Sequence, residues 1–246
     1  MLLKSLREEV LEANLELVRR GLVLYTFGNA SGIDRAQGLI VIKPSGVDYD
    51  NLRPEHMVVV DLNGETVEGT LKPSSDLDTH TLLYREFDAI GAVVHTHSEF
   101  ATSFAQAGLA IPAFGTTHAD YFHGPVPCTA PLTDNAIEGR YVHETGRAIV
   151  ALFRGAKAAI GATGRIDPMA VPACLVAGHA PFVWGKNAHD AAHNAVVLEA
   201  VARMAYRTLT LNANAGEVSE ALLNRHYLRK HGSSATYGQA NAAPKS

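Results

Sequence analysis

The chain has 246 residues, of which 47% are hydrophobic and 19% are charged, so it is long enough to bury one sizeable core. A formal net charge of −4 argues against a nucleic-acid partner, and two cysteines, Cys128 and Cys174, are too few for a disulfide framework. The charged first residues are not a signal peptide, and no run approaches the roughly 20 apolar residues of a membrane span. We therefore expect a cytoplasmic protein with no membrane partner.

Helical and strand patterns mix along the chain without a strict βαβ rhythm. An amphipathic helix is predicted over residues 3–20, with Gly21 at its end. Strands are predicted at 39–42 and 57–60, and Asn63-Gly64 makes a turn into a further short strand. The later elements are a helix at 76–87, a strand at 92–97, helices at 100–107 and 135–153, a loop at 154–170, strands at 173–177 and 182–184, and a helix at 188–209. This order predicts one α/β domain with a central, partly antiparallel sheet surrounded by helices.

Several histidines fall where a metal site is expected. His95 and His97 are two apart on a predicted strand, so both side chains point to the same face and can reach one ion. Asp76 begins the preceding helix. A third imidazole is available from His179, which ends another buried strand, or from His118 in a polar patch, and spacing alone does not separate the two. Three imidazoles and a carboxylate suit Zn²⁺ or a similar divalent ion.

Three segments with small residues and hydroxyl groups have the composition of an anion-binding cradle. They are Gly28-Asn29-Ala30-Ser31-Gly32, Lys43-Pro44-Ser45-Gly46 and Lys72-Pro73-Ser74-Ser75. Asn29 and Lys43 can add direct contacts, and Ser74 and Ser75 precede a helix N-terminus, which favours negative charge. Each segment alone is better explained as a turn or a helix cap.

A metal that polarises a carbonyl beside a bound phosphate points to sugar-phosphate chemistry, which needs a proton donor and a proton acceptor. Asp120 and Tyr237 are candidates for these roles. Taken alone, Asp120 is better explained as a turn or cap residue, and Tyr237 as an anchor for a polar tail. Residues 226–231 form a basic turn that could also be a solvated helix end.

Together these residues resemble the class II aldolase/epimerase family over nearly the whole chain. The motifs that carry the resemblance are Gly28-Asn29-x-Ser31, Ile42-Lys43-Pro44-Ser45-Gly46-Val47-Asp48-Tyr49, Lys72-Pro73-Ser74-Ser75-Asp76, His95-Thr96-His97-Ser98, Gly115-Thr116-Thr117-His118-Ala119-Asp120-Tyr121-Phe122, Pro181-Phe182-x-Trp184-Gly185-Lys186-Asn187 and His226-Tyr227-Leu228-Arg229-Lys230-His231-Gly232. The resemblance implies a three-layer α/β domain over residues 1–230, with a central, mostly antiparallel sheet flanked by helices. Residues 231–246 would form a partly flexible tail that carries Tyr237.

The resemblance also implies a role for each site residue. The metal, Zn²⁺ or alternatively Mn²⁺ or Co²⁺, would bind Asp76, His95, His97 and His179, which favours His179 over His118. The substrate phosphate would bind Asn29, Lys43, Ser45, Gly46, Ser74 and Ser75, with Thr116, His226 and Arg229 also near the substrate. Asp120 and Tyr237 would be the acid/base pair. Members of the family are homotetramers with active sites between subunits, which would explain a catalytic residue in a tail.

The implied reaction interconverts L-ribulose 5-phosphate and D-xylulose 5-phosphate through cleavage and re-formation of the C3–C4 bond. One alternative is a sugar-phosphate aldolase of the fuculose-phosphate aldolase type, which releases the aldehyde, and another is a non-catalytic adaptor with the same fold. Related aldolases carry glutamate where this chain has Asp76, so the shorter side chain favours the epimerase. An adaptor would have lost its metal ligands, and all four are present. The loop at 154–170 is longer than is usual in the family, and residues 176–178 also depart from the pattern of close relatives.

Overall fold

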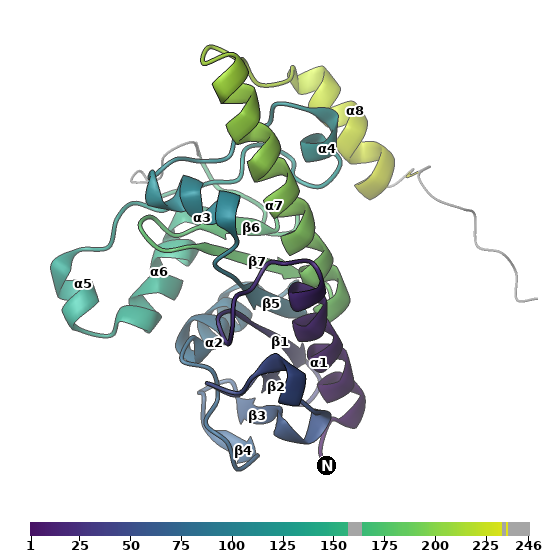
Figure 1. Ribbon diagram of the computed structural model, residues 1–246, viewed down its shortest axis with the longest axis vertical. Coiled ribbons are helices and arrows are strands. Elements are labelled where there is room, and N and C mark those ends of the chain that lie inside the picture. Colours follow the sequence, from purple (N-terminus) through teal and green to yellow (C-terminus); the bar gives the residue numbers. More distant parts are fainter. Residues whose placement is uncertain (157–163, 233–234, 236–246) are drawn as a thin grey trace, which may run out of the picture.

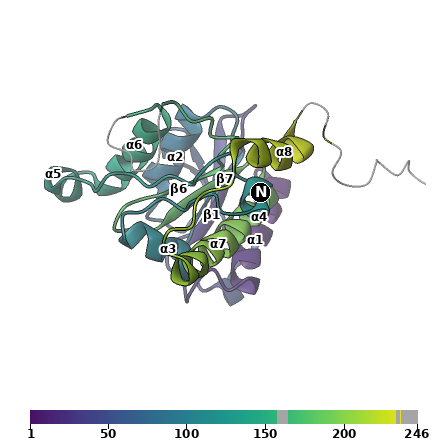
Figure 2. The same ribbon diagram turned by 90° about the horizontal axis from the view of Figure 1, so that it is seen from above.

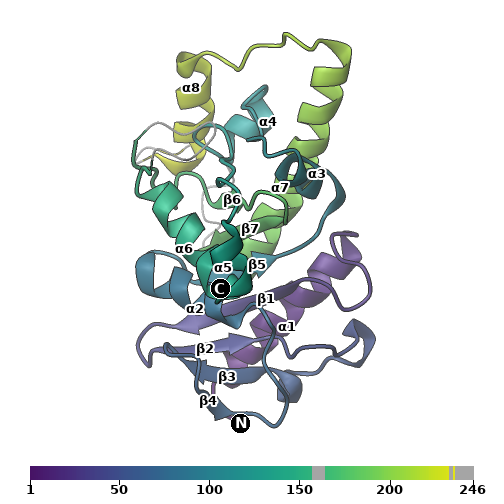
Figure 3. The ribbon, with the colours of Figure 1, turned by 90° about the vertical axis from the view of Figure 1, so that its left-hand side faces the viewer.

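The fold is built on a seven-stranded sheet with the strand order β4-β3-β2-β1-β5-β7-β6, in which all neighbouring strands are antiparallel. The computed structural model describes residues 1–156, 164–232 and 235. The strands are β1 Asn29–Asp34, β2 Leu39–Ile42, β3 Val58–Asp61, β4 Thr66–Glu68, β5 Ala92–His95, β6 Ala173–Leu175 and β7 Pro181–Gly185. Figure 3 shows them as a ladder that rises from β4 to β6.

Helices cover both faces of the sheet. The helices are α1 Lys4–Arg19, α2 Leu77–Glu86, α3 Glu99–Gln106, α4 Thr116–Ala119, α5 Asp134–Glu138, α6 Tyr141–Phe153, α7 Ala188–Leu211 and α8 Glu220–His231, with short 3₁₀ turns at Tyr49–Asn51 and Pro54–His56. Helices α1 and α7 lie on one face, and α2 and α6 lie on the other (Figure 2). The α4–α8 pair lies at the upper end of the molecule, beyond the sheet (Figure 1).

Two hydrophobic clusters separate the three layers. Val94 of β5 belongs to the same cluster as Leu17 of α1 and Leu198 of α7, whereas its neighbour Val93 belongs to the other cluster, with Leu83 of α2 and Ile149 of α6. Successive strand residues point to opposite faces, so a fully apolar strand can serve both layers. The predicted α/β fold with a mostly antiparallel sheet and helices on both sides is confirmed.

The elements with strong local patterns lie where they are predicted. Helix α1 ends in the expected way: Gly21 has a φ of +69°, its N–H donates to Val18 O at 2.9 Å, and Leu22 N–H donates to Leu17 O at 2.9 Å. These two bonds form a Schellman cap, in which glycine takes the left-handed position without a Cβ clash. The predicted helix at 135–153 is wrong in one respect, because Gly139 and Arg140 leave the helical conformation and divide it into α5 and α6.

Strand β1 is not predicted from the sequence, because five of its six residues are poor strand formers. It lies in the middle of the sheet between β2 and β5. The buried side chain of Asn14 on α1 supports it, since Asn14 Oδ1 accepts Ala30 N–H at 2.9 Å and Asn14 Nδ2 donates to Ala30 O at 3.2 Å. Tertiary pairing therefore decides this strand.

Three sequence-based expectations concern the later part of the chain. Residues 226–231 belong to the C-terminal half of α8. Within the loop at 154–170 the described residues form no helix or strand, and 157–163 lie outside the described residues, as does Tyr237. No helix in the described ranges is long and apolar enough to cross a membrane.

Candidate metal and anion site

His95 and His97 lie where the central strand β5 ends. His95 is the last strand residue and is buried, and the exposed His97 follows between the buried Thr96 and Ser98, before α3. Their Nε2 atoms face each other at 3.1 Å. Two imidazole nitrogens on one tetrahedral Zn²⁺ would be about 3.3 Å apart, given Zn–N distances near 2.05 Å. His95 Nδ1–H donates to Pro181 O at 2.9 Å, which leaves the Nε2 lone pair for a metal.

His179 completes a group of three imidazoles. It lies in the turn between β6 and β7, where Val176 N–H donates to Ala180 O and His179 N–H donates to Val176 O. Its ring centroid is 4.9 Å from that of His95 and 5.1 Å from that of His97. One ligand nitrogen from each of the three lies within 4.8 Å of the others.

His118, the other candidate for the third imidazole, is not part of this group. It is buried within α4, and its Nε2–H donates to Gly124 O at 2.7 Å. Burial lowers the pKa of His118 to about 4, so the ring is neutral at pH 7.

The three imidazoles have the protonation state that a metal requires. Burial lowers the pKa of His95 and of His97, and it lowers that of His179 to about 4, below the ordinary value of 6.5. The rings are therefore neutral at pH 7, with lone pairs available. Three neutral imidazoles that converge on one point, one with its second nitrogen fixed by a carbonyl, fit Zn²⁺ or a similar divalent ion.

Asp76 adds a carboxylate near the three imidazoles, although it does not belong to the close group of His95, His97 and His179. It occupies the N-cap position of α2 without a capping bond from its side chain, and its Oδ2 accepts Asn29 Nδ2–H at 2.6 Å. Burial raises the pKa of this carboxyl, but the His95 and His80 imidazoles and the Asn29 amide outweigh the burial, so the pKa is lower than usual. Asp76 is therefore an anion at pH 7, as a metal ligand must be.

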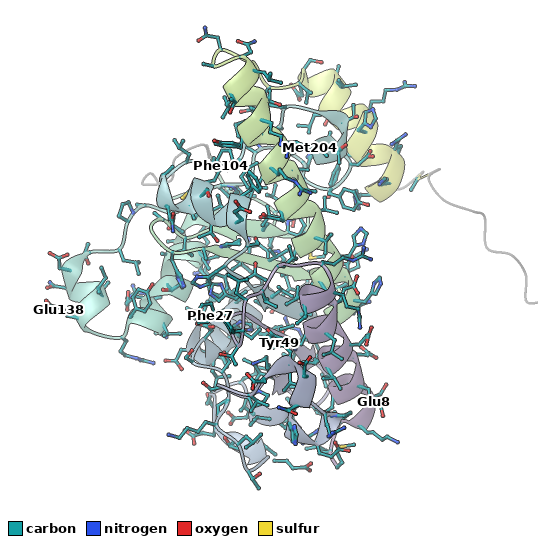
Figure 4. The ribbon with its side chains drawn as sticks, in the orientation of Figure 1. Glu8, Phe27, Tyr49, Phe104, Glu138 and Met204 are labelled. Atoms are coloured by element: carbon teal, nitrogen blue, oxygen red, sulfur yellow. The ribbon has the colours of Figure 1, made fainter. Side chains whose placement is uncertain are left out.

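One cavity of about 450 Å³ is lined by every residue that the sequence assigns to the metal or to the phosphate. These residues are Asn29, Lys43, Ser45, Gly46, Ser74, Ser75, Asp76, His95, His97 and His179. Asn29 reaches this wall because Gly28 (φ +78°) lets the chain pass close to β5, where a Cβ would lie 3.0 Å from His95 O. Phe27, labelled near the middle of Figure 4, also lines the cavity, with its ring centroid 6.3 Å from that of His97.

The two Lys-Pro-Ser segments meet although they are far apart in the sequence. Pro44 and Pro73 form an antiparallel bridge, Ser45 N–H donates to Lys72 O at 2.9 Å, and Ser74 N–H donates to Lys43 O at 3.0 Å. This bridge places Ser45 and Gly46 beside Ser74 and Ser75 at the start of α2. Backbone N–H groups and hydroxyls there can bind an anion.

Lys43 supplies the positive charge of this region. Its side chain is buried, and its Nζ donates to Pro44 O at 3.2 Å and lies 4.7 Å from the Tyr49 ring centroid. Burial lowers the pKa of Lys43 to about 8, against the opposing effect of Asp48. A buried ammonium with few partners gains by binding an anion.

Asp120 and the described residues bonded to it do not line this cavity. Asp120 ends α4 and accepts hydrogen bonds from His226 Nδ1 at 3.0 Å and from Arg229 Nη2 at 3.0 Å, both on α8. Burial raises the pKa of Asp120, but Arg229 and His226 lower it by more, so it is ionised at pH 7. Neither these residues nor Thr116, which begins α4, lines the metal cavity of their own chain within the described ranges.

Two further residues touch the site and are not predicted from the sequence. Tyr141, at the start of α6, has its Oη 3.3 Å from His179 Nδ1. No sequence pattern connects the two, because only folding brings α6 to the β6–β7 turn. His80 on α2 is fully buried close to Asp76, and its place one helical turn after Asp76 is a signal that the sequence does contain.

Comparisons with known proteins agree with this arrangement. The family model described as Class II Aldolase and Adducin N-terminal domain matches residues 8–206. Proteins named L-ribulose-5-phosphate 4-epimerase UlaF from Salmonella paratyphi A and Salmonella typhi are 48% identical over 237 residues, which cover 96% of this chain and 100% of each relative.

Solved structures show the same fold. An L-fuculose 1-phosphate aldolase superposes with a TM-score of 0.74 at 23% identity, covering 90% of this chain and 94% of its own. The YgbL protein of Klebsiella pneumoniae superposes with a TM-score of 0.68 at 25% identity, covering 90% and 97%. The three-layer arrangement is therefore shared with class II aldolases.

Proposed function

The chain belongs to the class II aldolase and adducin family, and from this premise we propose that it is a metal-dependent L-ribulose-5-phosphate 4-epimerase. The observation that carries the metal-dependent chemistry is the single cavity in which three imidazoles and a carboxylate face an anion-binding cradle. The choice of substrate follows the UlaF relatives, which match along their whole length. The reaction interconverts L-ribulose 5-phosphate and D-xylulose 5-phosphate.

The residues of this chain hold the substrate at both ends. Lys43, Ser45, Gly46, Ser74 and Ser75, with Asn29 beside them, would bind the phosphate, since they supply an ammonium, hydroxyls and a helix N-terminus. Asp76, His95, His97 and His179 would hold the divalent ion, Zn²⁺ being the first choice and Mn²⁺ or Co²⁺ alternatives. When bound, such an ion acts as a Lewis acid toward a carbonyl. The ketose is thereby fixed between the two regions.

Asp120 and Tyr237 would move the protons, with Thr116, His226 and Arg229 near the substrate. A base removes the proton of the C4 hydroxyl, the C3–C4 bond breaks, and its electron pair passes to the C2–C3 enediolate. Glycolaldehyde phosphate turns to present its other face, C3 attacks again, and an acid returns a proton to the new C4 alkoxide. No atom is gained or lost, and the C4 configuration is inverted.

The separation of the two halves of the site supports an oligomer. Asp120 and the metal cavity of one chain are apart, so a neighbouring copy would have to bring Asp120 and Tyr237 to the cavity. We therefore propose a homotetramer with active sites between subunits, in the cytoplasm, with a catalytic domain over 1–230 and a tail over 231–246 that carries Tyr237.

The aldolase of the fuculose-phosphate type is the second candidate because it shares the fold. Asp76 favours the epimerase, since its short carboxylate is already bonded to Asn29 and would stay at the metal. A longer glutamate would reach further toward a substrate carbon.

Product analysis decides between the two. L-ribulose 5-phosphate is supplied to the Zn²⁺-loaded protein, and the products are separated and identified by NMR. We expect D-xylulose 5-phosphate to accumulate to equilibrium. Dihydroxyacetone and glycolaldehyde phosphate as the main products would instead identify an aldolase.

Subunit mixing tests the shared site. His97→Asn and Asp120→Asn should each be inactive, but unfolding and refolding an equal mixture should restore activity. Random assembly gives about a quarter of the sites one intact metal half and one intact proton-transfer half. A mixture as inactive as its two parents would refute the shared site.

A further inference from the structure

A buried polar chain runs beneath the metal cavity and involves none of the residues assigned above to metal or phosphate. His80 of α2 bonds through its Nδ1 to Ser31 Oγ of β1 at 2.7 Å, and Ser31 Oγ lies 2.7 Å from Tyr84 Oη. All three side chains are fully buried. Burial lowers the pKa of His80 to about 3, so the ring is neutral and carries one N–H.

The second ring nitrogen of His80 has no partner among the described residues. Nε2 is buried and makes no hydrogen bond, which is uncommon for a polar atom in a folded core. The ring lies in edge contact with Phe182, at 6.1 Å between centroids, and Phe182 stacks on His95 at 4.2 Å. The unpaired nitrogen therefore belongs to the layer directly under the metal ligands.

Asp76 is the charged group with the largest influence on His80. The two residues lie one turn apart on the same side of α2, and His80 N–H bonds to Asp76 O at 3.2 Å. Among the charges that act on His80, the Asp76 carboxylate is the leading one, and it favours a proton on the ring. Asp76 Oδ2 is bonded to Asn29 and Ser74, whereas no bond to its other oxygen is found in the described part of the chain.

The direction of the hydrogen bonds follows from this charge. The nearby Asp76 carboxylate favours a proton on the outer ring nitrogen over a lone pair there, so we place the proton on Nε2, and Nδ1 is then the acceptor. Ser31 then donates to Nδ1 and accepts from Tyr84, so that the hydroxyl groups of Ser31 and Tyr84 each donate one hydrogen bond. Tyr84 and Ser31 thus select the tautomer that offers Nε2–H to Asp76.

We propose that His80 is a positioning residue, whose Nε2–H holds the Asp76 carboxylate toward the three imidazoles, directly or through one bound water. The proposal rests on the proposed metal site. It assigns to the Ser31–Tyr84 pair the task of fixing the His80 tautomer, as outer partners commonly do for groups around a metal.

Two substitutions separate this role from simple structural support. The amide nitrogen of His80→Gln lies near the place of Nε2, and that of His80→Asn lies near the place of Nδ1. We expect His80→Gln to keep Zn²⁺ affinity within about threefold, and His80→Asn to lose about 10- to 100-fold. If His80 only supports Ser31 and Tyr84, the order reverses, and that result overturns the proposal, as does unchanged affinity in both variants.

The readouts are a competition titration with a chromophoric chelator and the visible absorption spectrum of the Co²⁺-loaded protein. Neither depends on turnover. His56→Gln is the matched control, because His56 also has a buried nitrogen, Nδ1, without a partner but lies in the 3₁₀ turn Pro54–His56, away from the cavity. Its Zn²⁺ affinity should equal that of the wild type.

A second measurement tests the proposal even if the His80 variants do not fold. Long-range ¹H–¹⁵N correlation spectra of the wild type should show His80 as the Nε2–H tautomer, with a shift that changes in Asp76→Asn. The Nδ1–H tautomer would overturn the proposal. If the wild type does not bind Zn²⁺, or if His97→Asn binds it as tightly as the wild type, the proposed metal site itself is refuted.

Discussion

Replacing Lys43 with methionine tests the anion-binding half of the site. Methionine keeps the length of the buried side chain and removes its charge. Lys43 is 1% exposed, and the protein partners of its ammonium are a carbonyl and the ring of Tyr49. A substrate phosphate would be its first anionic partner in direct contact, so most of the lost energy should appear in substrate binding.

The expected magnitude follows from the kind of bond that is lost. A hydrogen bond to a charged partner contributes about 1.5–3 kcal/mol, so KM should rise about 10- to 150-fold in Lys43→Met. The kcat should change much less, because the phosphate gains no charge and makes no bond when the C3–C4 bond breaks. Loss of a phosphate contact that raised only KM would mean that Lys43 binds the ground state and the transition state equally well.

The pH dependence of KM provides a second test of the role of Lys43. Burial lowers the pKa of Lys43 to about 8, so the free protein loses this charge as the pH rises through 8. A bound phosphate favours the charged form, and therefore substrate affinity falls as the charge is lost. The wild-type KM should rise above pH 8, by up to about tenfold per pH unit, and Lys43→Met should lack this rise.

The assay measures initial rates of D-xylulose 5-phosphate formation from about pH 6.5 to 9.5. Lys72→Met is the matched control, because Lys72 occupies the same place in the second Lys-Pro-Ser segment but is exposed and does not line the cavity. It should behave as the wild type. The role of Lys43 is refuted if the KM of Lys43→Met stays within about twofold of the wild type at pH 7, or if this variant keeps the alkaline rise.

Three further outcomes are expected. His97→Asn should lose Zn²⁺ affinity and activity together in a chelator titration, and full activity of metal-free protein would contradict the site. Asn14→Ala should lower the free energy of unfolding in urea by about 2–4 kcal/mol, because it leaves the buried Ala30 N–H unpaired; a loss below about 1 kcal/mol would mean that this N–H finds another partner. His118 has a pKa of about 4 in the folded state against 6.5 as the ordinary value, so the unfolded chain binds its proton first. The free energy of unfolding should therefore fall by on the order of 3 kcal/mol as the pH drops from 6.5 to 4, and thermal unfolding of His118→Leu should show a slope smaller by about one proton.

Where a local pattern is strong, it predicts the element. Apolar residues at helical spacing place the helix at 3–20 close to α1, and the buried runs at 39–42 and 92–97 coincide closely with β2 and β5. The period of a helix or a strand is a property of the backbone, so it is visible without tertiary contacts. The failures include the break between α5 and α6, the whole of β1, the short helix α4, and α8, of which only residues 226–231 are singled out, as a basic turn.

The candidate site, like the fold, is predictable from the sequence only in part. The residues proposed to bind the metal and the phosphate are recognisable in the sequence, but only within their own short motifs. The bridge between Pro44 and Pro73 and the turn that carries His179 depend on chain crossings that no local pattern encodes.

The sequence by itself determined which side chains are available for metal and anion binding. It also determined which of them share one face of a helix or strand, because side-chain identity and backbone period are local properties. The spacing of His95 and His97 is enough to make them a pair on one face of a strand. Only the tertiary structure selected His179 over His118 by geometry and revealed that His80 is buried with an unpartnered Nε2. It also kept Asp120 out of the metal cavity of its own chain. Those relations depend on the packing of segments distant in sequence, and their free energy comes from burial that exists only in the folded state.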